Sequence, residues 1–261
     1  MSTRAGSELS TLVRQTQELA ASRRPVAIGL LTGLIALLVW ALVVFGKYGG
    51  NPTGLARIGD QLPLSPRLQG ADLVILKGKR GNDGQQFLSL ALDPLQQLPG
   101  TSAALDNPIY RGKRLLFPLL AWLAGLGQPA LIPWSLGLIN VALIGCCGAL
   151  VAAWAQLEQR SPQWGLAVLA LPSYWVTLSL DTADLLATTL LLASAVAGKR
   201  ALRLAVQASR GRGTRARGSS QRQRRSLRLV RPEEAQASRP VSRLSRATDR
   251  LATKAAGRWL R

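Results

Sequence analysis

The chain has 261 residues, and its 33 Lys and Arg residues outnumber its 13 Asp and Glu residues, which gives a formal net charge of +20. It contains no histidine, so a Ser-His-Asp triad, a His-ligated metal and a His general base are all excluded. Its two cysteines, Cys146 and Cys147, are adjacent within an apolar stretch, which excludes a disulfide framework and the cysteine spacing of zinc sites.

The first long apolar segment covers residues 26–46 and contains no charged residue. About 20 apolar residues in an α-helix cross the hydrocarbon core of a bilayer. A cleaved secretory signal fits less well, because the segment ends in the bulky residues Trp40 and Phe45 and has no small-residue cleavage site. We therefore predict a membrane span that is retained.

Charge around this span sets the expected orientation. Four arginines precede it, at positions 4, 14, 23 and 24, so the positive-inside tendency places the segment 1–25 in the cytoplasm. The polar stretch 47–114 then forms a long outer loop. We expect short helices within this loop, the first around 85–92, separated by turns at the Gly and Pro clusters.

The remaining apolar material lies between residues 115 and 198. Residues 115–126 are too few to cross a bilayer and favour an interfacial or re-entrant helix. Residues 134–157, 164–180 and 185–198 are the expected further spans. The sequence thus predicts an all-α membrane protein with about four transmembrane helices in a membrane domain that covers residues 26–198.

The C-terminal segment 199–261 holds most of the positive charge, with 19 basic and three acidic residues. Its low apolar content predicts a disordered, Arg-rich cytoplasmic tail. Three interpretations stay open: a solvated extension, a patch that binds anionic lipid or nucleic acid, or residues that were not selected for folding, as in an out-of-frame product. We favour the last, and nucleic-acid binding least.

Asp83 is the most informative acidic residue of the outer loop, within the string Gly81-Asn82-Asp83-Gly84-Gln85. The flanking glycines allow a ligand to approach the backbone closely, and the Gln85 amide is suited to a sugar hydroxyl. The same string is also strong turn chemistry. Spacing alone favours the turn.

A second acidic group lies just before the expected interfacial helix. Asp106 precedes Arg111 and Arg114, whose spacing places both arginines on one helical face, where they can bind phosphate or reach lipid headgroups. Asp181 and Asp184 share one side of the last expected break and face the same compartment as Asp83. Each has a structural alternative as a turn or cap residue.

Several motifs in order carry a resemblance to a known family. The chain contains Gly49-Gly50-Asn51-Pro52-Thr53-Gly54, Gly81-Asn82-Asp83-Gly84-Gln85, Ala91-Leu92-Asp93-Pro94, and Leu105-Asp106-Asn107-Pro108 with Tyr110, Arg111 and Arg114. Over residues 26–197, this order of motifs, spans and breaks resembles bacterial multi-spanning glycosyltransferases of the GT-C superfamily.

The resemblance implies an integral protein of the bacterial inner membrane. Such an enzyme transfers a sugar, with inversion, from a polyprenyl-phosphate donor to a cell-surface glycan or lipid acceptor on the non-cytoplasmic face. The general base that the family places in its first outer loop would be Asp83, with Asp106 as second choice. The implied substrate-binding residues are Gln85, Tyr110, Arg111, Arg114, Asp181 and Asp184. No cofactor is implied, and use of a divalent metal stays open although the outer loop has no Asp-x-Asp pair.

The chain also departs from the family pattern. Asn82 stands where a tyrosine is usual, and Leu180 stands where relatives often place a basic residue. Relatives continue with further membrane helices beyond the position of Ala197, so the resemblance predicts a copy truncated or frameshifted after about residue 198, whose activity stays open. The alternative function is a non-catalytic membrane anchor whose basic tail binds anionic lipid or nucleic acid.

Overall fold

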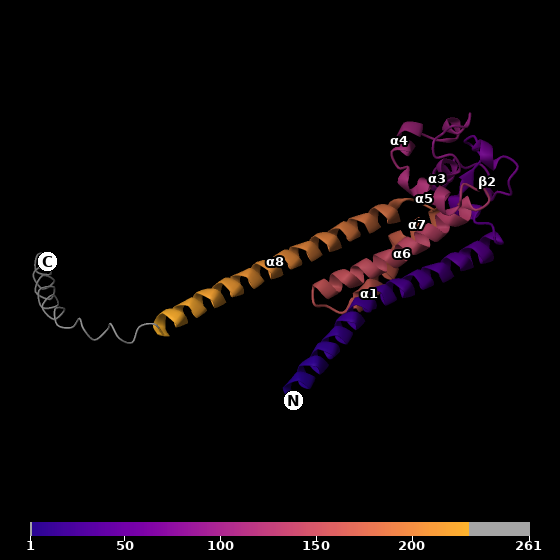
Figure 1. The fold of residues 1–261 in the computed structure, drawn as a ribbon. Helices are drawn as coiled ribbons and strands as arrows, with labels where there is room; N and C mark the ends of the chain where they lie inside the picture. Colours follow the sequence, from indigo (N-terminus) through magenta and orange to yellow (C-terminus); the bar gives the residue numbers. More distant parts are fainter. Residues whose placement is uncertain (1, 230–261) are drawn as a thin grey trace, which may run out of the picture. The chain divides into compact units, whose positions relative to one another are not determined.

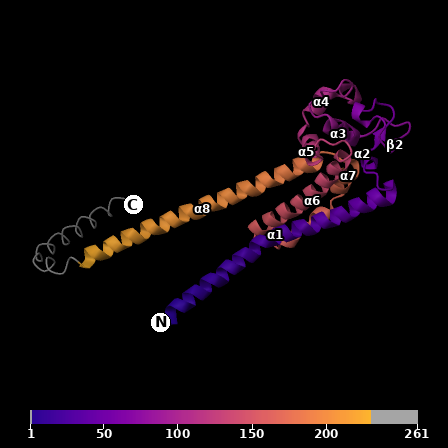
Figure 2. The same cartoon turned by 45° about the vertical axis from the view of Figure 1, so that its right-hand side comes forward.

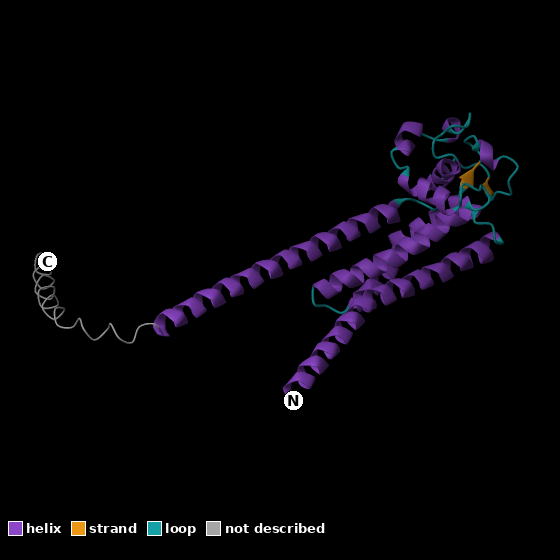
Figure 3. Cartoon of the chain, in the orientation of Figure 1, coloured by secondary structure: helices purple, strands orange, loops and turns teal. Residues whose placement is uncertain are grey.

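The computed structural model describes the backbone of residues 2–229 and side chains over residues 23–208. The fold is mostly helical, with 69% helix and 2% strand, as Figure 3 shows. This confirms the expected helical class. The chain divides into two compact units, Met1–Ala201 and Leu202–Arg261.

The long helices α1, α6 and α8 are separated by runs of short elements (Figure 1). In order they are α1 (Ser2–Tyr48), α2 (Thr53–Ala56), β1 (Ile58–Gly59), η1 (Pro66–Leu68), β2 (Ile75–Leu76), α3 (Asp83–Leu92), η2 (Ser102–Ala104), α4 (Pro108–Gly112), α5 (Leu116–Ala124), α6 (Ile132–Leu157), η3 (Pro162–Ala170), α7 (Pro172–Leu180) and α8 (Asp184–Leu229). The elements labelled η are 3₁₀-helices, and β1 and β2 pair in parallel.

Within the described residues, three helical stretches are long and apolar enough to cross a membrane. They are Arg23–Tyr48 in α1, Ile132–Leu157 in α6 and Asp184–Ala208 in α8. Each contains at least 25 residues, and about 20 suffice for a hydrocarbon core. These helices indicate a membrane protein, and three of the four expected spans have a helix at their place.

α1 and α6 pack closely through small residues, and both ribbon views place them side by side (Figures 1 and 2). A Cβ atom on Gly29 would lie 2.7 Å from the Ala149 Cβ and 2.9 Å from the Gly145 carbonyl oxygen. The Thr32 hydroxyl donates a hydrogen bond to the Gly29 carbonyl oxygen of its own helix, at 2.9 Å. Thr32 therefore adds no unpaired polar group to the interface. This is the small-residue contact that lets two membrane helices approach.

The segment between α1 and α6 has its own apolar core, formed around α3 and α5. Phe87 and Phe117 are both buried and meet edge to face, with ring centroids 5.7 Å apart. Ile132 and Leu136 at the start of α6 belong to the same cluster. The segment between α1 and α6 is thus packed onto the end of a long apolar helix, which fixes where its polar residues lie.

A carboxylate closes the loop that follows α3. Asp93 accepts hydrogen bonds from the N–H groups of Gln97 and Leu98, at 3.0 and 2.9 Å, and from the Thr101 hydroxyl at 2.7 Å. Burial alone would raise the pKa of Asp93, but these three donors and the charge of Arg67 outweigh it and lower the pKa below its usual value. Asp93 therefore has a structural role as an anion.

Two expectations about the membrane domain are not confirmed. The predicted span 164–180 is divided into η3 and α7, each nine residues long, because Leu171 is extended (φ −86°, ψ 112°), as residues before proline prefer. The predicted disorder from residue 199 is not seen up to residue 229, since α8 continues that far. Ala, Leu and Arg, which have high helix propensity, are frequent over residues 199–208. The rest of the expected tail, 230–261, lies outside the described residues.

The short helix expected over 115–126 is present as α5, and the one expected around 85–92 as α3. α5 has nine residues, fewer than a membrane crossing requires. It exposes Leu116 and Leu123 while burying Phe117 and Ala121. Such a two-sided apolar surface is typical of a helix at a membrane interface.

Candidate functional site

Asp83 occupies the first turn of α3, directly after Asn82 at the N-cap position. Gly84 brings this turn against the end of α7, because a Cβ atom at position 84 would lie 2.3 Å from the Leu180 carbonyl oxygen and 2.9 Å from the Ala56 Cα. Gly81 allows the preceding bend with φ +84°. The turn suggested by the sequence is thus present, and it carries a carboxylate into contact with distant elements.

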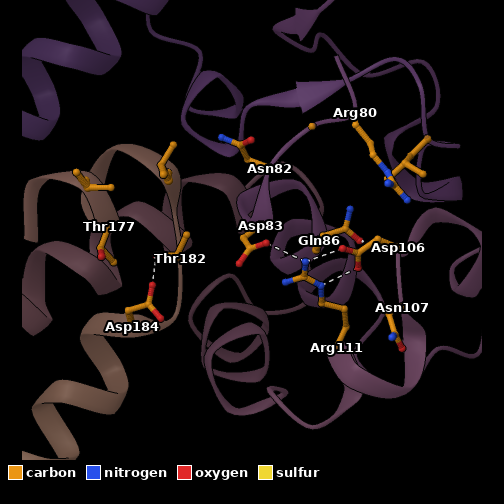
Figure 4. A pocket seen from close by; sticks show the side chains of 14 residues that line it. Arg80, Asn82, Asp83, Gln86, Asp106, Asn107, Arg111, Thr177, Thr182 and Asp184 are labelled. Carbon is orange, nitrogen blue, oxygen red and sulfur yellow. Dashed lines mark hydrogen bonds and ion pairs between the residues drawn. The ribbon is translucent and has the colours of Figure 1, made fainter. Parts of the chain in front are cut away.

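Arg111 of α4 lies between two carboxylates, as Figure 4 shows. Its Nη2 donates to the Asp83 Oδ1 at 2.8 Å and to the Asp106 Oδ2 at 2.7 Å, and its Nε donates to the Asp106 Oδ1 at 2.8 Å. The Arg111 side chain is 6% exposed, whereas that of Asp83 is 47% exposed. A buried guanidinium is therefore held by two charge-assisted pairs, one of them bidentate.

The contacts among Arg111, Asp83 and Asp106 also affect the pKa values of Asp106 and Arg111. The hydrogen bond from Arg111 lowers the pKa of Asp106 below its usual value, although partial burial acts in the opposite direction. The hydrogen bond to Asp106 is in turn the largest cause that raises the pKa of Arg111. Asp106 and Arg111 are thus charged across the physiological pH range, with Asp106 committed to the arginine.

A cavity of about 630 Å³ opens beside this cluster. Four of the residues singled out from the sequence line it: Asp83, Asp106, Arg111 and Asp184. Asp184 begins α8 and accepts a hydrogen bond from the Thr182 hydroxyl at 3.1 Å. Figure 4 places Thr182 and Asp184 on the side of the cavity opposite Asp106. The fold therefore brings residues that are up to about 100 positions apart into one polar site.

The other four expected residues lie elsewhere. Gln85 is buried, and its Oε1 accepts a hydrogen bond from the Gly59 N–H at 2.9 Å, which ties α3 to β1. Tyr110 and Arg114 stack on each other, with the guanidinium carbon 4.7 Å from the ring centroid, and neither lines the cavity. Asp181 is buried behind the cavity wall.

Gln86 lines the cavity in place of Gln85, which was expected there from the sequence. Residues three apart share a helix face, so Gln86 lies on the face of Asp83 while Gln85 is turned into the core. The Gln86 Oε1 accepts a hydrogen bond from the Asp106 N–H at 3.0 Å. The helix periodicity of α3 was the signal that identifies Gln86. Thr177 and Thr182 also line the cavity, and no local motif marks them.

Within the described part of the chain, no group of three or more His, Cys, Asp and Glu side chains is arranged to hold a metal ion. Asp83 and Asp106 do lie near each other, but Arg111 stands between them and compensates one of their two negative charges. The arrangement offers an anchored carboxylate and a guanidinium, which together suit proton abstraction and the binding of an anion.

Comparison with known proteins gives no further assignment: no family model, no curated protein and no solved structure matches the chain.

Proposed function

We propose that this chain is a membrane-embedded glycosyltransferase, which transfers a sugar from a polyprenyl-phosphate donor to a cell-surface glycan or lipid acceptor on the non-cytoplasmic face. One observation carries the proposal. Arg111 binds only one oxygen of Asp83, the Oδ1, and among the described residues Oδ2 has no hydrogen-bond partner, while Asp83 lines the cavity. Asp83 is thus an oriented carboxylate with a free oxygen.

The chemistry of sugar transfer needs such a carboxylate. Asp83 accepts the proton of the acceptor hydroxyl, the acceptor oxygen bonds to the anomeric carbon of the donor, and the bond between that carbon and the phosphate oxygen breaks. Polyprenyl phosphate leaves with the electron pair. A base positioned in this way typically contributes about 10²- to 10⁴-fold to the rate.

Arg111 suits the departing phosphate. Its Nη1 is buried and lacks a hydrogen-bond partner, although the other two guanidinium nitrogens are fully engaged. A buried donor without a partner is rare in proteins. Since Arg111 lines the cavity, an anion bound there would lie beside its guanidinium group. Hydrogen bonds to the leaving group strengthen as its negative charge develops, which accelerates the reaction.

The cavity has the size and lining that the donor sugar requires. Its volume of about 630 Å³ is within the usual range for small-ligand sites, roughly 300–1,000 Å³. Amide and hydroxyl groups of Asn82, Gln86 and Thr177 line it, together with the apolar Val176 and Leu180. Asp184 at its edge begins one of the three membrane-spanning candidates. A sugar headgroup attached to a membrane lipid would therefore reach the site.

Donor turnover by the purified full-length chain in lipid nanodiscs tests the proposal. A panel of radiolabelled polyprenyl-phosphate sugars is supplied, and release of polyprenyl phosphate is measured for the wild type, Asp83→Asn and the control Asp72→Asn. Asp72 is exposed and lies outside the cavity. We expect turnover of at least one donor by the wild type and the control, and none by Asp83→Asn. Equal turnover by Asp83→Asn, or no turnover of any donor, contradicts the proposal.

The alternative function, a non-catalytic membrane anchor, stays a prediction. Removal of the basic C-terminal segment distinguishes the anchor from the transferase. A chain that ends at Ala208 retains the three candidate spans of the described residues and the Lys199–Glu158 ion pair, and it lacks the Arg-rich residues from Arg210 onward. The transferase proposal expects this chain to keep its donor turnover. An anchor would instead lose salt-sensitive binding to anionic vesicles, with no turnover in either form.

A further inference from the structure

Asp181 lies at a turn that is important for the cavity, although it does not line the cavity itself. It follows α7 in the left-handed conformation, with φ 47° and ψ 49°. The next residue, Thr182, and the first residue of α8, Asp184, both line the cavity, as does Thr177 one turn earlier. The geometry at Asp181 therefore decides where Thr182 and Asp184 are placed.

The carboxyl group of Asp181 is buried without a cation. Only 1% of the residue is exposed, and none of the ion pairs among the described residues includes it. Burial raises its pKa well above the usual value, and Asn140 is the one side chain that acts in the opposite direction. An uncompensated charge in such surroundings costs several kcal/mol, so a carboxyl group takes up a proton instead.

Asn140 of α6 also has buried polar atoms without hydrogen-bond partners. It is fully buried, and neither its Nδ2 nor its Oδ1 has a well-formed hydrogen bond, which is also true of the Asp181 Oδ1. Buried amides are almost always hydrogen-bonded. A neutral carboxylic acid and an amide are complementary, since the acid O–H donates to the amide oxygen and the amide N–H donates to the carboxyl oxygen. Pairing the two satisfies the orphaned atoms of both.

We propose that Asp181 is a neutral carboxylic acid paired with Asn140, and that this pair is a positioning element that holds the turn between α7 and α8, and thereby Thr182 and Asp184, at the cavity. A left-handed conformation costs a non-glycine residue about 1–2 kcal/mol, so it requires support from its surroundings. The pair supplies that support by joining the turn to α6. The inference goes beyond sugar transfer and replaces direct contact with substrate as the role of Asp181.

Infrared spectroscopy of the full-length protein tests the protonation state. In a detergent without ester groups at neutral pH, the wild type should show the C=O band of a protonated carboxylic acid. The band should persist in Asp184→Asn and disappear in Asp181→Asn. In Asn140→Leu it should move to higher wavenumber, because the carbonyl loses its hydrogen bond. A wild type without the band, or a band that persists in Asp181→Asn, overturns the proposal.

Cysteine reactivity tests the positioning role. In a Cys146→Ala, Cys147→Ala background, Thr182→Cys should react slowly with a water-soluble maleimide, because residue 182 is 7% exposed. Asp184→Cys provides the fast reference, since residue 184 is exposed. Adding Asp181→Asn should preserve the slow rate at position 182, whereas Asp181→Leu should raise it several-fold. Equal rates in these two variants contradict the proposal, and if Asp181→Leu does not fold, the infrared result for Asp181→Asn decides.

Discussion

Arg111 and Asp83 are 28 positions apart in the chain, yet the Arg111 Nη2 lies 2.8 Å from the Asp83 Oδ1. The contact joins the first turn of α3 to α4, and Asp106 holds the other edge of the same guanidinium. Because Arg111 is almost fully buried while Asp83 is half exposed, the arginine orients the carboxylate without covering it. The site therefore depends on the planar fork of an arginine.

Arg111→Lys should weaken the site although it retains the charge. An ammonium group lacks the fork that reaches Asp83 and both oxygens of Asp106. Loss of one hydrogen bond to a charged group costs about 1.5–3 kcal/mol, which corresponds to roughly 10- to 100-fold in donor turnover. Lys113→Arg, on the exposed neighbouring residue, is the matched control. Normal turnover by Arg111→Lys would show that a point charge suffices.

Gly84→Ala should disturb both stability and activity. The new methyl group would meet the Leu180 carbonyl oxygen and the Ala56 Cα, which are backbone atoms and cannot move independently. Such overpacking typically costs about 1–3 kcal/mol, and here it also separates Asp83 from α7. Thermal unfolding and donor turnover measure the two effects. Gly112→Ala serves as the control, because the nearest atom to its new methyl group lies 3.8 Å away. Equal melting temperatures for both variants would refute the close contact.

Asp93→Asn should destabilise the segment between α1 and α6 while leaving the cavity lining intact. An amide cannot accept all three hydrogen bonds that the carboxylate accepts from Gln97, Leu98 and Thr101. One donor left without a partner costs about 1–3 kcal/mol. Denaturant unfolding at neutral pH measures this cost, and Asp72→Asn, at an exposed position, is the control.

The loss of unfolding free energy caused by Asp93→Asn should depend on pH in a defined direction. The pKa of Asp93 is lowered in the folded protein, so its carboxylate stabilises the fold above the usual carboxyl pKa of about 4 and loses this effect as the pH falls through the lowered value. The difference in unfolding free energy between wild type and variant should therefore be constant near neutral pH and decrease in strong acid. A difference that grows on acidification would contradict the assigned shift.

Gly29→Leu should prevent the close approach of α1 and α6. A side chain at position 29 would collide with Ala149 and with the Gly145 carbonyl oxygen. Gly46→Leu on the same helix is the control, since no atom lies within 4 Å of its new Cβ. Disulfide trapping between cysteines on the two helices measures the approach. We expect it to fail in Gly29→Leu only, and equal trapping in both variants would argue against this interface.

Much of the framework follows from sequence alone because it depends on local chemistry. The apolar run 26–46 predicts a helix of membrane length, and the glycines around Asp83 predict a turn. The span predicted over 164–180 is absent for an equally local reason. Pro172 divides the stretch, and its mostly apolar composition does not indicate this break. The Ala, Leu and Arg residues directly after residue 199 have high helix propensity, which agrees with the continuation of α8 past that position.

The sequence by itself determined which chemistry the chain can use: carboxylates and guanidinium groups without histidine, beside apolar segments that cross a membrane. Only the tertiary structure decided which of these groups meet. The cavity is lined by Asp83, Asp106, Arg111 and Asp184. Asp181 is buried and does not line it. Gln86 lines the cavity, whereas Gln85 is buried in the core. The physical reason is that local patterns specify helices and turns, while the packing of α3 against α5 and α7 sets which face of each element borders the cavity.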